Sequence, residues 1–133
     1  ALSMLEVPLQ VSHMDLCPLY EDCAFLEAWP GVPVGNEEGE IITQALRDKR
    51  AILLSHHGQL STGSTIEEAC VIAQLIERAA KLQLLAMAAG TIKPILPQLG
   101  REAHDWISKP KRHGAAFNYY ARQNLRQHAD CLN

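Results

Sequence analysis

The chain has 133 residues, of which 47% are hydrophobic, and it carries a formal net charge of −3. This length predicts a single compact domain with its own core, and the mildly acidic balance does not favour a nucleic acid partner. Charged residues interrupt the longest apolar stretch, so neither a membrane span nor a secretory leader is expected. Four cysteines without a C-x-x-C pair favour free thiols in a reducing cytoplasm over a zinc ribbon.

Short elements are predicted ahead of the first clear helix. Residues 1–6 resemble the end of a helix, and residues 9–12, which follow a proline, predict a short strand. Residues 17–29 predict a helical turn or an irregular helix, and the Pro- and Gly-rich segment that follows predicts a loop. Residues 37–49 then combine apolar positions at helical spacing with acids in the first turn and bases in the last. That pattern indicates a surface helix.

A strand, a turn, a second strand and a long helix are predicted next. Residues 51–54 form the continuous apolar run that is typical of a buried strand, and residues 59–61 predict a second short strand. Ser64 and Glu67 have the spacing of a capping box, which predicts a helix from this point to about Ala89. Its apolar surface is wide, so we expect it to pack on a sheet and partly on another helix or another subunit.

The C-terminal tail, residues 90–133, predicts two helices. Residues 98–108 predict the first, Pro110 ends it, and residues 115–130 predict an amphipathic terminal helix. Strands that alternate with helices point to α/β layering.

Two adjacent histidines and a glycine end the buried strand. Imidazole is a common zinc ligand, and a strand end supports it rigidly. Gly58 keeps the approach free of a side chain. Neighbouring residues of a strand point to opposite faces, so only one of His56 and His57 can face a given site. Taken alone, the pair also fits hydrogen-bonded structural histidines.

The segment around this turn resembles the class II aldolase/adducin family. It contains the family's aliphatic strand, its (N/H)-H-G turn, a short strand ending in glycine, a (T/S)-x-E-E-A helix start and a helix resembling L-E-x-x-A-x-x-x-L. These pieces stand in order at residues 51–54, 56–58, 63, 65–69 and 76–80. A looser match extends over residues 1–90.

The resemblance implies a fold and a metal site. The fold is a three-layer α/β/α sandwich, with a central sheet flanked by helices, of which residues 1–133 form the C-terminal portion of a single domain. The last histidine of the turn is the third ligand of zinc, or another divalent ion, one per chain, which carries over to His57. His56 then supports the ligand or the fold. The family's H-x-H pair and an assisting carboxylate lie upstream of the segment matched by Ala1, so we expect a C-terminal half that is inactive alone.

Three further residues are candidates for proton transfer. Residues 12–15, SHMD, resemble the T-H-x-D of the family's sugar-phosphate epimerases, in which the Asp acts across a subunit interface. This implies a catalytic role for Asp15 with His13 beside it; alternatively, His13 caps a strand and Asp15 begins the next turn. Tyr120 resembles the C-terminal aromatic residue that members bring over a neighbour's site, and a packing role is the alternative.

The remaining histidines match nothing in the family and are expected at the surface: His104, His113 and His128.

The resemblance implies a zinc-dependent lyase that cleaves a C–C bond of a ketose-like or 2-oxo acid substrate through a metal-stabilised enediolate. Related chemistry serves a decarboxylase or a sugar-phosphate epimerase. A non-catalytic adducin-like oligomerisation module and an unrelated structural α/β domain are the other interpretations. The expected partners are a small-molecule substrate, further copies of the chain in a homo-oligomer, commonly a tetramer, and the N-terminal half of the same protein. Neither nucleic acid nor a membrane is expected.

Overall fold

A computed structural model describes residues 1–32 and 35–132. The described chain contains three strands, β1 to β3, four α-helices, α1 to α4, and three short 3-10 helices, η1 to η3. The strands are β1 (Cys23–Leu26), β2 (Ala51–Leu54) and β3 (Gly58–Ser61). The α-helices are α1 (Glu37–Leu46), α2 (Ile66–Ala89), α3 (Pro97–Ile107) and α4 (Pro110–Gln127). The 3-10 helices are η1 (Leu2–Leu5), η2 (Met14–Leu19) and η3 (Ala129–Leu132).

The sheet has β2 at its centre. β1 pairs with it in parallel, and β3 returns antiparallel through the histidine turn, with Leu54 opposite Gly58 and Ala51 opposite Ser61. All four residues of β2 are buried, as its unbroken apolar run predicted. The two ends of β2 therefore differ: the histidine turn lies at one end, and residue 50 and the start of α2 lie at the other.

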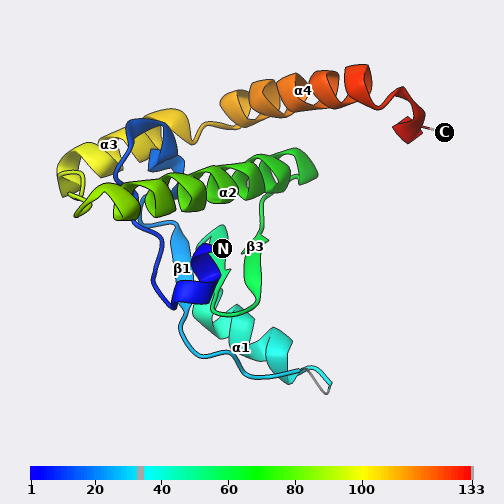
Figure 1. Ribbon diagram of the computed structural model, residues 1–133. Coiled ribbons are helices and arrows are strands. Elements are labelled where there is room, and N and C mark those ends of the chain that lie inside the picture. The colour runs from blue at the N-terminus through cyan, green and yellow to red at the C-terminus, as the bar shows by residue number, and fades with distance from the viewer. Residues whose placement is uncertain (33–34, 133) are drawn as a thin grey trace.

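Helices cover both faces of this sheet (Figure 1). Ala51 belongs to a core with Ile72, Ile76 and Ala79 of α2, whereas Ile52 and Leu54 belong to a second core that includes residues of α1. The alternation follows from the period of two along a strand. The expected α/β fold with a sheet between helical layers is confirmed.

Two predictions for the N-terminal region are wrong, one of them only in part. Residues 9–12 do not form a strand, because the buried side chain of Gln83 satisfies the backbone there: Gln10 N–H donates to its Oε1 (2.7 Å), and its Nε2 donates to the Pro8 carbonyl (3.0 Å). Residues 17–29 are predicted as a helical turn or an irregular helix; their first residues complete the 3-10 helix η2, but residues 23–26 form the strand β1. Pairing with β2 explains why a stretch of four residues becomes a strand.

The start of α2 differs by one residue from its prediction. Thr65, not Ser64, is the N-cap, and its hydroxyl accepts from Glu68 N–H (3.2 Å). The carboxylate of Glu68 reaches back to Ser64, accepting from its N–H (2.8 Å) and from its hydroxyl (2.7 Å). The backbone N–H groups of Ser64 and Glu68 are thus both hydrogen-bonded, as in a capping box shifted by one position. The predicted end at Ala89 is confirmed.

The tail is helical, as predicted. α3 packs on η2, and Gly100 lies directly against the Tyr20 ring, where an added Cβ would approach ring atoms to 2.5 Å. α4 starts at Pro110, earlier than predicted, because proline at the first helical position loses no hydrogen bond. Its first turns pack on α2, and the rest runs past the body of the molecule (Figure 1).

The thiols of Cys17, Cys23 and Cys70 are free, as predicted; the Cys131 side chain lies outside the described part. Burial, reinforced by the neighbouring Asp22 carboxylate, raises the pKa of Cys23 to about 11. Among the residues that the structure describes, no helix is long and apolar enough to cross a bilayer.

Candidate functional site

The turn between β2 and β3 presents its histidines on fixed backbone. Ser55 N–H donates to the Leu26 carbonyl (3.0 Å), and His57 N–H donates to the Leu54 carbonyl (3.3 Å). Gly58 has φ +147°, a conformation that favours glycine, and nothing lies within 4 Å of where its Cβ would be. The turn is anchored by a buried strand and is open on its outer side.

His57 is about half exposed, and a carboxylate lies near it. Its Nε2 is 3.7 Å from Oε1 of Glu38, which stands in the first turn of α1 and whose side chain is only 19% exposed. Sequence reasoning missed Glu38, because the first-turn glutamates of α1 were explained by the helix dipole alone. The signal available in the sequence was that α1 directly precedes β2, the strand that ends at the turn with His57.

His56 points to a different partner. Its Nε2 lies 2.7 Å from Oε1 of Glu6, and its backbone N–H donates to the Ser3 carbonyl (3.0 Å). His56 has φ +57°, which is uncommon for a residue with a side chain, so these contacts hold a conformation that costs free energy. The first residues of the chain are thereby fixed against the histidine turn.

The residues at this turn fit part of a metal site. An exposed imidazole with an open approach and a carboxylate beside it suits a divalent cation. Within the described ranges, however, no group of three or more His, Cys, Asp or Glu side chains could hold a metal ion. A catalytic zinc site uses three protein ligands. His57 could supply one ligand of such a site, which the described residues do not complete.

The other predicted site residues do not meet His57 within one copy. His13 is the N-cap of η2: its Nδ1 accepts from Asp15 N–H (3.2 Å), and the Asp15 carboxylate lies 3.4 Å from Arg78 of α2. η2 leads into the end of β1 that pairs with Ala51, which is the end of the sheet away from the histidine turn. Tyr120 lies on α4, which packs on α2 near that same far end.

A polar cluster occupies the far end of β2. Arg50 Nε lies 2.5 Å from Asp22 Oδ2, and its Nη1 lies 3.0 Å from Glu68 Oε1. Its Nη2 lies 3.3 Å from His104 Nε2. This one guanidinium therefore ties together the start of β1, the start of α2 and helix α3.

The prediction of surface positions is wrong for His113 and holds for His128. His113 is 4% exposed, because the start of α4 packs its ring against α2 near Glu68. His104 is also largely covered, since its ring lies between Arg50 and Asp105. Burial lowers the pKa of His113, which favours its neutral form.

The carboxylate of Glu68 should give the fold a measurable dependence on acid. Hydrogen bonds from Ser64, together with the Arg50 charge, lower its pKa to about 2. A carboxylate whose pKa is lower in the folded protein than in the unfolded chain stabilises the fold. This stabilisation is complete above the unfolded-state pKa and is lost as the pH falls toward the folded-state pKa. We expect the free energy of unfolding to fall between about pH 5 and pH 2, and Glu68→Gln to flatten that profile. Urea denaturation across this pH range measures it; equal slopes for the two proteins would contradict it.

Comparison with known proteins identifies a family and several relatives of this chain. The family model described as "Class II Aldolase and Adducin N-terminal domain" matches residues 1–84. The chain is 33% identical over 111 residues to Decarboxylase NovR of Streptomyces niveus, covering 77% of this chain and 41% of the relative. It is 34% identical over 87 residues to a 4-hydroxy-3-prenylphenylpyruvate oxygenase/4-hydroxy-3-prenylbenzoate synthase of Streptomyces roseochromogenus, covering 65% and 31%.

Among solved structures, an L-fuculose 1-phosphate aldolase from Glaciozyma antarctica superposes with a TM-score of 0.82 at 29% identity. That match covers 97% of this chain and 48% of the other. The chain thus spans less than half the length of these relatives.

Proposed function

The chain belongs to the class II aldolase and adducin family, and from this premise we propose that it is part of a metal-dependent lyase that cleaves a C–C bond next to a carbonyl group. The observation that carries the proposal is the histidine turn. His57 stands half exposed at the end of a buried strand, Gly58 leaves its approach open, and Glu38 adds a negative charge nearby. Rigid support and open access are what a catalytic metal ligand requires.

We propose His57 as one of three protein ligands to zinc or another divalent ion, with the others contributed by residues that precede Ala1 in the full-length protein. The contact of His56 with Ser3 supports this, because it fixes the first residues of the chain against the turn. When bound, such an ion supplies Lewis acidity toward the substrate's oxygens. His56 holds the turn and the N-terminal segment together through Glu6.

Asp15, with His13, and Tyr120 are proposed to move protons at the site of another copy. In one copy they lie at the far end of the sheet from His57, so a role in catalysis requires a homo-oligomer, for which we propose a tetramer. Asp15 is exposed enough to reach a neighbour, and its carboxylate already has a charged partner in Arg78. A cytoplasmic location is part of the same proposal.

A decarboxylase acting on a hydroxy-aromatic or 2-oxo acid is the second candidate. The match to Decarboxylase NovR covers 77% of this chain, whereas that to the rhamnulose-1-phosphate aldolase of Listeria monocytogenes covers 47%. Between these two sequence matches the longer one favours the decarboxylase, whereas the structural match to an L-fuculose 1-phosphate aldolase, which covers 97% of this chain, favours the aldolase. The two reactions place the electrons of the broken bond differently. Retro-aldol cleavage leaves an enolate, whose oxygen a divalent cation would stabilise, whereas loss of CO₂ from a 2-oxo acid leaves the electrons on the carbonyl carbon and needs a co-reactant such as O₂, in line with the name of the oxygenase relative.

Turnover assays on the full-length protein test the proposal. It should act on a ketose 1-phosphate or on a 4-hydroxyphenyl 2-oxo acid, and chelation should abolish that activity until a divalent metal is restored. Cleavage to an aldehyde would identify the aldolase, and release of CO₂ would identify the decarboxylase. A folded, metal-free protein that acts on neither substrate class would contradict the proposal and favour a non-catalytic adducin-like module.

A further inference from the structure

Two helices of this chain carry charges of a single, opposite sign. α4 contains Lys111, Arg112, Arg122 and Arg126 and no acidic residue, whereas α1 contains Glu37, Glu38 and Glu40 and no basic residue. The same division runs through the whole sequence. Residues 1–89 contain twelve Asp and Glu against five Lys and Arg, and residues 90–133 contain three against seven. An acidic body therefore carries a basic tail.

The helix dipoles explain some of these charges but not all of them. Glutamates in the first turn of α1 and Arg126 in the last turn of α4 complement the helix dipoles. Lys111 and Arg112 stand in the first turn of α4, where the dipole disfavours positive charge, but Arg112 lies over the Trp106 ring, 5.2 Å from its centroid. Neither effect accounts for Arg122 in the middle of α4.

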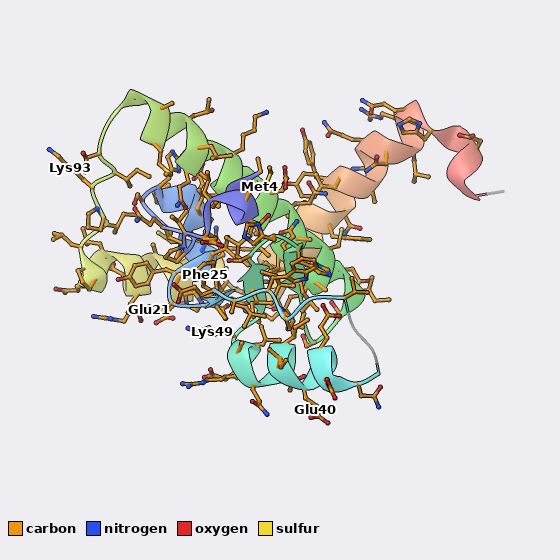
Figure 2. The ribbon with its side chains drawn as sticks, turned by 60° about the horizontal axis from the view of Figure 1, so that its bottom comes forward. Met4, Glu21, Phe25, Glu40, Lys49 and Lys93 are labelled. Atoms are coloured by element: carbon orange, nitrogen blue, oxygen red, sulfur yellow. The ribbon has the colours of Figure 1, made fainter. Side chains whose placement is uncertain are left out.

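Four of these charged residues have no ion-pair partner among the residues that the structure describes. In the part of the chain that the structure describes, no carboxylate lies within 4.0 Å of a charged nitrogen of Arg122 or Arg126, and no such nitrogen of a basic residue approaches Glu37 or Glu40. All four residues are exposed. α2 and the sheet separate α1 from α4 (Figure 1), and Glu40 points outward from α1 (Figure 2). The two helices cannot meet in the same molecule.

We propose that the C-terminal half of α4 in one copy docks on the first turns of α1 in a second copy, with Arg122 and Arg126 facing Glu37 and Glu40. The spacing allows it: residues four apart on α4 and three apart on α1 each lie on one helix face, about 5–6 Å apart. The exposed side chains of Tyr119 and Leu125 add apolar surface to the same half of α4.

A second copy suits this basic helix better than nucleic acid does. The acidic body, attached to the same chain, would repel a polyanion, whereas α1 of another copy offers complementary carboxylates. The docking rests on the charges and on the geometry, and it does not depend on the metal chemistry proposed above.

Self-association of the full-length protein, measured by sedimentation equilibrium, tests this contact. Arg122→Glu with Arg126→Glu should weaken association roughly tenfold at low salt, and the difference should shrink at about 0.5 M salt. Lys81→Glu with Lys93→Glu makes the same change of net charge at exposed positions off α4 and should associate like the wild type. Far-UV circular dichroism confirms that each variant is folded.

A charge exchange gives the decisive comparison. Glu37→Arg with Glu40→Arg should weaken association like the α4 variant, and the chain that carries all four substitutions should recover it. Wild-type association in both double variants, no recovery in the combined chain, or a monomeric wild-type protein would overturn the proposal. The proposal would also be overturned if Arg122→Glu with Arg126→Glu changed only the retention of RNA, because nucleic acid would then be the partner. Metal content is measured on the same samples. Loss of the proposed contact with metal still bound would separate failure of this docking proposal from failure of the proposed function.

Discussion

Replacing His57 with alanine is expected to remove bound divalent metal from the full-length protein while leaving it folded. Losing a residue that merely supports a ligand costs metal affinity about 10–100-fold, so losing a ligand should cost more than about 100-fold. Turnover should fall with the metal. The fold should persist, because the His57 side chain is half exposed. Elemental analysis and a thermal melt on the same sample give the two readouts.

His56→Ala is the matched control for this change. It removes the neighbouring imidazole and its contact with Glu6, and it should weaken metal binding by at most about 10–100-fold, less than His57→Ala does. Full metal occupancy in the His57 variant, or loss of metal in the His56 variant alone, would reverse the assignment of the two residues.

Replacing Arg50 with methionine is expected to destabilise the fold by about 3 kcal/mol. The change leaves the carboxylates of Asp22 and Glu68, whose side chains are 14% and 15% exposed, without their shared cation. Removing one member of a buried ion cluster costs far more than the cluster contributes net, because the remaining charges stay desolvated. Urea denaturation at neutral pH measures the loss.

Arg101→Met provides the comparison at the surface. Arg101 pairs with Glu21 at 2.9 Å, but both side chains are 57% exposed, so this change should cost less than about 1 kcal/mol. Equal losses for the two methionine variants would show that the Arg50 cluster is solvated like a surface pair.

Elements whose signal is local were predictable from the sequence. β2 is a continuous apolar run, and α2 has a cap, a wide apolar surface and a terminal glycine, so both were predicted within a residue or two. β1 was missed, because residues 23–26 become a strand only by pairing with β2, which stands more than twenty residues later. The backbone of residues 9–12 was misread for a similar reason: its partner is Gln83, a side chain far along the chain.

At the candidate site, too, the residues with a local sequence signal were predicted and those that depend on distant contacts were not. The turn that carries His57 was found from a contiguous motif, and its assignment as a ligand stays a prediction. Glu38, which stands beside His57, and the cluster around Arg50 depend on contacts between separate elements, which periodicity does not report. His113 was expected at the surface because it matches no motif of the family, yet the first turns of α4 pack against α2.

Metal content per chain of the full-length wild-type protein, measured by elemental analysis after purification without chelators, tests the central claim most directly. About one zinc or similar divalent ion per chain is the predicted result, and it would support His57 as part of a complete metal site. A folded protein without metal that also fails to bind added divalent ions would contradict the claim.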